Sequence, residues 1–174
     1  MQELKTYVRD IPDFPKKGII FKDITTLIKD KDAFRQAVDK IADEFKDKKI
    51  DLVLSVEARG FIFGSAVAYK LGVGVVPLRK KGKLPYKTYS ASYGLEYGQD
   101  TLEIHQDALK KGDRVLVVDD LLATGGTTRA VADLVEKMGG TIVGFAFAIE
   151  LVPLKGREKL KGYNILSLIK DEYC

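Results

Sequence analysis

The stretch from Val115 to Thr128 constrains the fold of this chain more than any other. It begins with four consecutive apolar residues, Val115-Leu116-Val117-Val118, most of which are β-branched. An unbroken apolar run predicts a strand that is buried on both faces, as the strands of a parallel sheet are. Two carboxylates, Asp119 and Asp120, follow the run directly. We therefore expect both acids at the C-terminal edge of a sheet, where open α/β sheets bind their ligands.

A loop of small residues follows the acids and leads into a predicted helix. The loop is Ala123-Thr124-Gly125-Gly126-Thr127, and the helix begins at Gly126 or Thr127 and ends at Met138. Backbone N–H groups of such a loop, at the positive end of a helix dipole, bind phosphate. The acids can accept hydrogen bonds from sugar hydroxyls or lie close to a divalent cation. The glycines alone also fit a tight turn without a ligand, but acids and loop together favour a ribose phosphate site.

The other apolar segments alternate between strands and helices. Strands are predicted at residues 52–56, 75–78, 141–149 and 163–169, and helices at residues 30–46 and 61–71. This alternation predicts an α/β fold with a mostly parallel central sheet flanked by helices. The 174 residues are the length of one domain and contain no internal repeat or linker. We therefore expect a single domain over residues 1–174.

Two segments do not follow this alternation. At the N-terminus, a short helix over residues 3–9 and an extended stretch at 18–24 are expected to form a small hood. Residues 80–107 are rich in Lys, Tyr, Ser and Gly, and they predict a flexible hairpin that projects from the sheet, with strands at 88–93 and 101–105. A long segment of this kind inside a compact domain is often a lid over a site, although a merely mobile ribbon has the same composition.

Charged groups follow two further predicted strands. Glu57-Ala58-Arg59-Gly60 lies where a strand ends and a helix begins, so its N–H groups and Arg59 can hold a second anion. Arg79-Lys80-Lys81-Gly82-Lys83 places four cations in five residues at the end of the next strand. Taken singly, the first is also typical of a capped turn and the second of a solvated surface. Together they suit a ligand with phosphates at two ends.

Composition and charge argue against several classes of protein. The net charge of +4 suits an anionic ligand, but it is too small to indicate nucleic acid binding, because no aromatic platform accompanies the cationic run. No apolar run approaches the ~20 residues that a membrane span requires. The N-terminus is charged and the only cysteine is Cys174, so we expect a cytoplasmic protein without an intrachain disulfide or a zinc cluster.

These motifs together resemble the adenine phosphoribosyltransferases, which are type I phosphoribosyltransferases. The resemblance spans nearly the whole chain and is most specific in five segments: Gly18–Ile24, Glu57–Phe61, Arg79–Pro85, Ala91–Gly98 and Val117–Thr127. It implies transfer of the 5-phosphoribosyl group from phosphoribosyl pyrophosphate (PRPP) to adenine, with AMP and pyrophosphate as products. It also implies a requirement for Mg²⁺ and a homodimer.

The resemblance assigns the binding of PRPP to three groups of residues. Asp119 and Asp120 are expected to hold the ribose hydroxyls, with Mg²⁺ held mainly by PRPP near them. The loop from Ala123 to Thr127 is expected to bind the 5′-phosphate. Pyrophosphate is expected to contact Glu57, Ala58, Arg59, Arg79 and Lys83. The resemblance also implies a cis peptide bond between Glu57 and Ala58.

The resemblance places recognition of the base elsewhere in the chain. The backbone of Ile20 and Lys22 is expected to contact the edge of adenine, and Phe21 its face. Glu96 is the expected acid and base at the purine N7, and Tyr97 is expected to help close the lid. Relatives often carry arginine where this chain has Lys22, which matters only if the side chain contacts the base.

Two other functions remain open from the sequence. A phosphoribosyltransferase for xanthine or hypoxanthine would share the PRPP site and differ at the base. A regulator that senses PRPP or a purine on the same fold would need a DNA-binding segment, and no helix-turn-helix precedes the predicted sheet.

Overall fold

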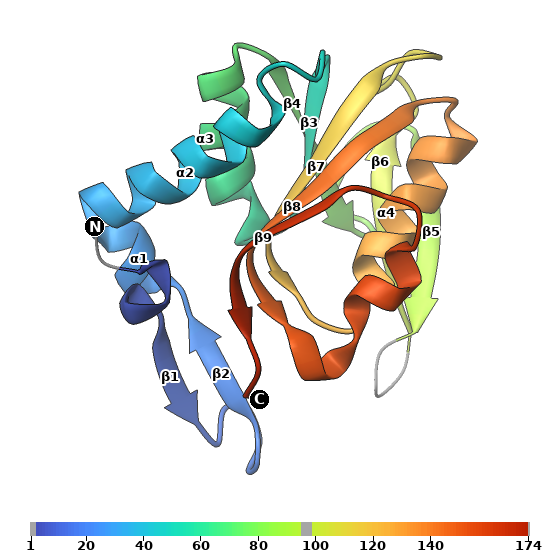
Figure 1. Cartoon of the computed structure of the whole chain (residues 1–174). Coiled ribbons are helices and arrows are strands. Elements are labelled where there is room, and N and C mark those ends of the chain that lie inside the picture. The colour runs from blue at the N-terminus through green and yellow to red at the C-terminus, as the bar shows by residue number, and fades with distance from the viewer. Residues whose placement is uncertain (1–2, 95–98, 174) are drawn as a thin grey trace.

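A twisted sheet of seven strands forms the centre of the molecule, in the order β5-β6-β4-β3-β7-β8-β9 (Figure 1). The computed structural model describes residues 3–94 and 99–173. Five of these strands run parallel to one another: β3 (Leu52–Val56), β4 (Gly74–Lys80), β7 (Arg114–Leu122), β8 (Thr141–Leu151) and β9 (Ile165–Asp171). The predicted α/β fold with a mostly parallel sheet is therefore confirmed.

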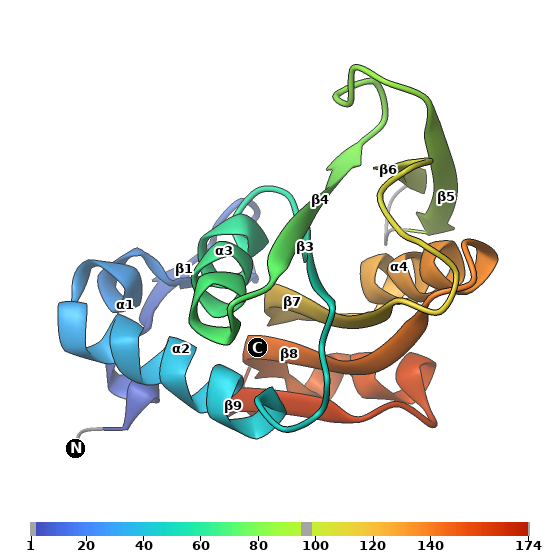
Figure 2. The same ribbon diagram turned by 90° about the horizontal axis from the view of Figure 1, so that it is seen from above.

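Helices cover both faces of the sheet, as Figure 2 shows. Helices α2 (Lys31–Phe45) and α3 (Gly60–Leu71) lie on one face, and α4 (Gly126–Lys137) lies on the other. None of the described helices is long and apolar enough to cross a membrane. The sheet thus separates two apolar cores, one under α2 and α3 and one under α4.

Strand β7 contributes side chains to both cores. Leu116 and Val118 pack into the core with α2 and α3, whereas Val115 and Val117 pack into the core with α4. Each of the four side chains is at most 1% exposed. Burying an aliphatic side chain of this size contributes about 1.5–3 kcal/mol, so the run strongly favours a central position. The strand continues to Leu122, further than the apolar run alone predicts.

Helix α2 forms where its capping residue and apolar spacing predict it. The Asp30 side chain accepts hydrogen bonds from the backbone N–H groups of Asp32 and Ala33, at 3.0 and 2.9 Å. Such a cap contributes roughly 1 kcal/mol. Ile41 and Phe45, one turn apart, are fully buried against the sheet.

The direction in which the chain progresses across the sheet reverses between β3 and β7. From β3 the chain passes through α3 to β4 on one side, and from β7 it passes through α4 to β8 on the other. Connections that leave adjacent strands in opposite directions open a crevice at the C-terminal ends of the strands. The two predicted anion-binding turns, Glu57–Gly60 and Ala123–Thr127, directly follow β3 and β7. The fold therefore brings both turns to one crevice.

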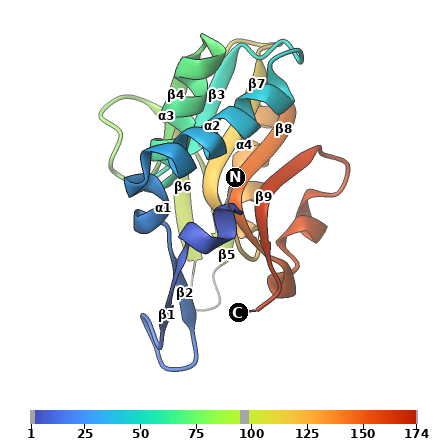
Figure 3. The same cartoon turned by 60° about the vertical axis from the view of Figure 1, so that its left-hand side comes forward.

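The N-terminal hood is a small antiparallel ribbon and not mainly a helix. Helix η1 is a 3-10 turn that covers only Leu4–Tyr7, and Arg9–Pro12 forms strand β1, which pairs with β2 (Ile20–Asp23). The expected helix over residues 3–9 is therefore present in its middle and wrong at its end, because Arg9 belongs to β1, where strand pairing with β2 overrides the weak local preference. A one-and-a-half-turn helix, α1 (Thr25–Lys29), joins the ribbon to α2. The ribbon stands beside the end of β9 (Figure 3).

The predicted hairpin is present as β5 (Thr88–Gly94) and β6 (Gln99–His105). It does not project freely, because β6 pairs with the end of β4 and its Leu102 and Ile104 are buried in the core under α4. The strands are thus an extension of the sheet. The tip of the hairpin, with the predicted Glu96 and Tyr97, lies outside the described residues.

Candidate active site

The two acids of the central strand lie within β7, near its C-terminal end. Asp119 Oδ1 accepts a hydrogen bond of 2.8 Å from the backbone N–H of Asp120. Burial, together with the neighbouring charge of Asp120, raises the pKa of Asp119 well above its ordinary value. Burial also raises the pKa of Asp120, although Arg59 opposes this. Two carboxylates held this way are poorly solvated, so they gain from hydroxyl donors or a cation.

Arg59 connects the acid pair to the hood. Its Nε lies 2.9 Å from Asp120 Oδ2, and its guanidinium carbon lies 5.0 Å from the ring centroid of Phe21. The contact with Asp120 has the distance of an ion pair without the geometry of a hydrogen bond. Within the described part of the chain, Asp120 Oδ2 is buried and has no hydrogen-bond partner. A buried acceptor of this kind is suited to a ligand hydroxyl.

The predicted phosphate loop leads directly into the N-terminus of α4. Gly125 has φ +76°, a left-handed conformation that favours glycine, and the helix begins at Gly126. No described side chain caps this helix end. Its first N–H groups therefore have no intrahelical or side-chain acceptor, and the helix dipole adds positive potential there. This is the geometry that binding of a phosphate by the loop from Ala123 to Thr127 requires.

The Glu57 carboxylate contacts cations at the end of β4 and after it, namely Arg79 in the strand and Lys83 beyond it. Its Oε2 lies 2.9 Å from Arg79 Nε, and its Oε1 lies 2.9 Å from both Lys83 Nζ and the backbone nitrogen of Lys80. Burial opposes ionisation of Glu57, but Lys83, the Lys80 N–H and Arg79 together hold its pKa below the ordinary value. The peptide bond between Glu57 and Ala58 is cis, as the resemblance implies. Glu57 thus orients Arg79 and Lys83 beside the turn.

A cavity of about 340 Å³ lies between the hood and the phosphate loop. Its lining residues come from three segments: Gly18, Ile19, Ile20, Ala123, Thr124, Leu151 and Leu154. The size and the mostly apolar lining suit a planar base. Ile20 was predicted at this place, whereas Leu151 and Leu154 were not. The sequence pattern ended the strand at residue 149, and β8 in fact reaches Leu151, so these residues arrive beside the loop.

The side chains of Phe21 and Lys22 have different surroundings. The ring of Phe21 packs edge-on against Phe14, at 5.2 Å between centroids, and its face is covered by Arg59. The Lys22 side chain is 3% exposed and is bound to Asp171 and Asp10. The Lys22 side chain is thus already paired with carboxylates, and contact of a base with the Lys22 backbone stays a prediction.

Comparison with known proteins identifies the family. A family model described as the phosphoribosyl transferase domain matches residues 25–170. The adenine phosphoribosyltransferase of Clostridium kluyveri is 65% identical over 167 residues, which cover 96% of this chain and 97% of that protein. The chain belongs to the adenine phosphoribosyltransferases.

Solved structures of adenine phosphoribosyltransferases share the whole architecture. The protein from Thermoanaerobacter pseudethanolicus is 56% identical, with a TM-score of 0.93, and the match covers 97% of this chain and 98% of that one. The protein from Saccharomyces cerevisiae is 39% identical, with a TM-score of 0.89 and coverage of 95% and 96%, and it was solved with adenine and an iminoaltritol bisphosphate. The fold of this adenine phosphoribosyltransferase family thus extends over nearly all of the chain.

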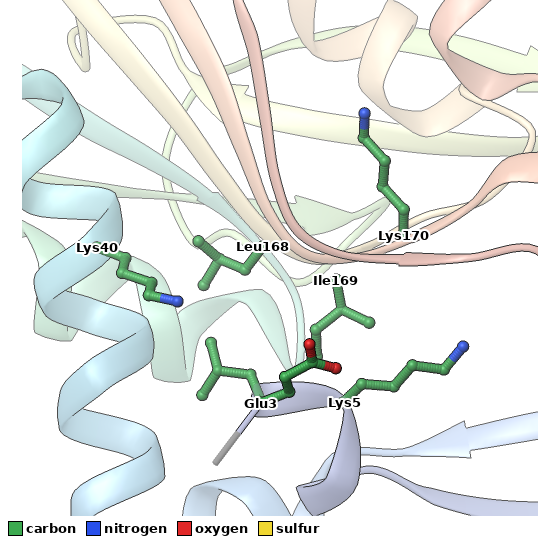
Figure 4. Close-up of a pocket in the computed structure, with 7 residues that line it drawn as sticks. Glu3, Lys5, Lys40, Leu168, Ile169 and Lys170 are labelled. Atoms are coloured by element: carbon green, nitrogen blue, oxygen red, sulfur yellow. The ribbon is translucent and has the colours of Figure 1, made fainter. Parts of the chain in front are cut away.

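A second cavity, of about 320 Å³, lies beside the end of β9, on the outer edge of the sheet of this phosphoribosyltransferase (Figure 4). It is lined by residues of η1, α2 and β9, including Glu3, Lys5 and Lys40. Lys5 already pairs with Asp171, at 3.3 Å. Neither the acid pair nor the start of α4 borders this cavity, so we assign the active site to the crevice at β3 and β7.

Proposed function

We propose that the protein transfers the 5-phosphoribosyl group of PRPP to adenine, releasing pyrophosphate and forming AMP. The observation that carries the proposal is the convergence of three groups on one crevice. These are a carboxylate pair with an open acceptor, an uncapped helix N-terminus and a cation cluster around Glu57. The adenine in the yeast relative supports adenine as the base.

Each group matches one part of PRPP. Asp119 and Asp120 accept hydrogen bonds from the ribose hydroxyls, and the N–H groups from Ala123 to Thr127 bind the 5′-phosphate. Arg79 and Lys83, oriented by Glu57, hold the pyrophosphate together with the Ala58–Arg59 turn. Arg59 releases Asp120 when the ribose occupies that acceptor and turns to the pyrophosphate.

The donor set fits a Mg²⁺ ion held mainly by PRPP. Among the described residues, no group of three or more His, Cys, Asp or Glu side chains could hold a metal by itself. Asp119 and Asp120 offer two adjacent carboxylates, and Mg²⁺ commonly binds through one or two carboxylates plus substrate phosphates. When bound, Mg²⁺ would neutralise the negative charge that develops on the leaving pyrophosphate.

In the reaction, the bond between the anomeric carbon and the pyrophosphate oxygen breaks, and adenine N9 forms a bond to that carbon. The sugar is cationic in between, so the nearby carboxylates stabilise it and the cations stabilise the leaving group. The proton that adenine sheds passes from N7 to Glu96, carried by the hairpin tip. The closed hairpin excludes water, which would otherwise capture the sugar.

The base occupies the cavity between the hood and the phosphate loop. Ile20 and Lys22 contact its edge through the backbone, and Phe21 contacts its face once Arg59 has moved. Leu151 and Leu154 form the opposite wall. The proposal includes Tyr97 in lid closure, a homodimer, no nucleic acid partner and a cytoplasmic location, as the resemblance and the composition imply.

The test is an assay of purified protein with Mg²⁺, PRPP and each of adenine, hypoxanthine, xanthine and guanine. AMP formation with a clear preference for adenine is expected. Preference for xanthine or hypoxanthine would assign the protein to another purine. Specific DNA binding without turnover of any base would instead support a regulator.

A further inference from the structure

The segment from Leu151 to Arg157 lies against both halves of the site. Leu151 and Leu154 line the cavity proposed for the base. Two residues later, Gly156 packs against the back of the phosphate loop. In Figure 1 these turns, between β8 and β9, lie beside the loop that joins β7 to α4. The same short segment therefore borders the base cavity and the phosphate loop.

The contact with the loop is between two backbones. A Cβ added at Gly156 would lie 2.1 Å from the carbonyl oxygen of Ala123 and 2.9 Å from the nitrogen of Gly125. A Cβ added at Gly125 would lie 2.4 Å from the carbonyl oxygen of Gly156. Real Cβ atoms do not approach backbone atoms so closely, so neither position accepts a side chain without movement of the loop. The two glycines thus fix how near the segment and the loop can lie.

An ion pair between the half-exposed Arg157 and the buried Glu150 holds this segment in place. Arg157 donates from Nε to Glu150 Oε1 at 2.9 Å and from Nη2 to Glu150 Oε2 at 2.5 Å. Ser167 donates to the same carboxylate at 2.6 Å, and Arg157 also reaches the carbonyl oxygen of Ile165 at 3.3 Å. Glu150 is only 5% exposed. A two-point pair of this kind restricts the position of the arginine, and with it that of the adjacent Gly156.

We propose that Gly156 and Arg157 are positioning residues for the 5′-phosphate of PRPP. Gly156 supports Ala123 and Gly125 from behind, in the conformation that directs the N–H groups of the loop toward a phosphate. Arg157, through Glu150 and Ser167, anchors that support to β8 and β9. Leu151 and Leu154 belong to the same segment, so the position of this segment also sets the distance between the phosphate loop and the base. This inference rests on the proposed function.

The physical reason is preorganisation. The start of α4 has no side-chain cap, so its first N–H groups are left for the phosphate and do not fix the loop through a capping bond. A loop that must first be ordered binds more weakly, because part of the binding energy is used for ordering. The contact with Gly156 orders the loop before the ligand binds and so lowers the part of the binding energy that is used for ordering.

The first test is the substitution Gly156→Ala. The KM for PRPP and the Kd for ribose 5-phosphate, measured by calorimetry, should both rise about tenfold or more, while kcat changes much less. The matched control is Gly74→Ala at the start of β4, where the nearest atom is the flexible end of Leu52 at 3.0 Å. The control should leave both constants unchanged.

A second pair of variants acts on the anchor without crowding the loop. Arg157→Met removes the ion pair, and Arg157→Lys keeps the charge with fewer hydrogen bonds, so the Kd for ribose 5-phosphate should rise in the order wild type, lysine, methionine. Hydrogen exchange on the wild-type protein needs no substitution. It should show that ribose 5-phosphate increases protection at residues 123–127 and at residues 156–157 together.

The outcomes separate this inference from the proposed function. Loss of thermal stability with unchanged ribose 5-phosphate binding and unchanged KM for PRPP would show a merely structural role and overturn the inference. Protection confined to residues 123–127 would also count against it. If the wild-type protein binds ribose 5-phosphate but forms no AMP, the proposed function fails while the Kd values still decide the inference. If the wild-type protein does not bind ribose 5-phosphate, the inference fails, and AMP formation still decides the proposed function.

Discussion

Arg59 shows how much a single side chain decides in this site. The run Glu57-Ala58-Arg59-Gly60 predicts an anion-binding arginine. In the structure its guanidinium lies on Asp120 and over the ring of Phe21, where the sugar and the base are proposed to meet. The cation therefore compensates the acid pair in this conformation. Its contact with pyrophosphate remains a prediction that requires the side chain to turn.

We predict that Arg59→Ala weakens PRPP binding and shifts the pH dependence of activity. Arg59 lowers the pKa of Asp120, so its removal raises that pKa and protonates the acid pair at higher pH. A protonated carboxyl is a poorer acceptor for ribose hydroxyls, so the acid limb of kcat/KM should move to higher pH. The measurement is the pH profile of kcat/KM for PRPP. Arg59→Lys keeps the charge, so its pH profile should lie close to that of the wild type. An acid limb that does not move in Arg59→Ala would contradict the role of Arg59.

A second prediction at this scale concerns Glu96, whose role comes from the resemblance and lies outside the described residues. Glu96→Gln cannot accept the proton from adenine N7, so kcat should fall by about 10²–10⁴-fold. The Kd for ribose 5-phosphate should stay the same, because that ligand lacks the base. Steady-state kinetics and calorimetry measure the two effects. A rate equal to that of the wild type would remove Glu96 from the mechanism.

Among the elements, the hood depends most on contacts that are remote in sequence. Strand β2 brings Ile20 to the base cavity, and its Lys22 is bound to Asp171 of β9 and Asp10 of β1. Lys5 reaches Asp171 as well. Burial lowers the pKa of Lys22, but these carboxylates more than reverse the effect and raise it, so the lysine stays charged. The hood is thus fastened to the C-terminal strand by a buried charge network.

We predict that Lys22→Met loosens the hood. It leaves Asp171 buried beside fewer cations, and removing one partner of a buried pair typically costs about 3 kcal/mol of unfolding free energy. The KM for adenine should rise more than the KM for PRPP, because residues 18–20 of the hood line the base cavity directly. Denaturant unfolding and steady-state kinetics give the two readouts. Lys22→Arg, which keeps the charge, should behave like the wild type; equal increases in both KM values would argue against a role specific to the hood.

Across the whole molecule, carboxylates with cation partners make the free energy of unfolding depend on pH. Cations and N–H donors hold the pKa of Glu57, Glu150 and Asp171 below their ordinary values despite burial. Hydrogen bonds from Arg9 and Thr25 lower the pKa of Asp23 to about 2. Glu57 ties the end of β3 to β4, Glu150 ties β8 to β9, and Asp171 ties the hood to the sheet, whereas Asp23 ties β1 to β2 within the hood.

We predict that these four carboxylates make the unfolding free energy decline as the pH falls below about 4, whereas Asp119 and Asp120, whose pKa values are raised, contribute with the opposite sign above that pH. A carboxyl whose pKa is lower in the folded state stabilises the protein fully above its unfolded pKa, which is about 4. That contribution is lost as the pH falls below this value toward the folded pKa. Thermal or denaturant unfolding from pH 7 to pH 2.5 measures the decline. Asp171→Asn should flatten part of it, and a stability that rises in acid would contradict the assignment.

Much of the architecture follows from local pattern. The apolar run before Asp119 predicted a central strand because no polar residue interrupts it, and Asp30 predicted the start of α2 because its carboxylate caps the helix. The loop from Ala123 to Thr127 predicted the strand–helix turn because glycine adopts the left-handed conformation seen at Gly125. In each case residues close in the chain supply the decisive energy.

Local pattern failed where pairing or packing with distant residues decides. Arg9, expected at the end of a helix, lies in strand β1 because that strand pairs with β2, and the hairpin joined the sheet because Leu102 and Ile104 belong to the core. The walls of the base cavity at Leu151 and Leu154 were missed because their position depends on where β8 ends beside β7.

By itself the sequence of this protein determined the α/β class, the strand with its acid pair, the phosphate loop and the family resemblance. These depend on residue types at short spacing, which act through local conformation and periodic burial. Only the tertiary structure decided that Glu57 gathers Arg79 and Lys83, that Lys22 is fastened to Asp171, and that Gly156 backs Gly125. Such contacts join residues that become neighbours only when the sheet orders its strands, so no local pattern contains them.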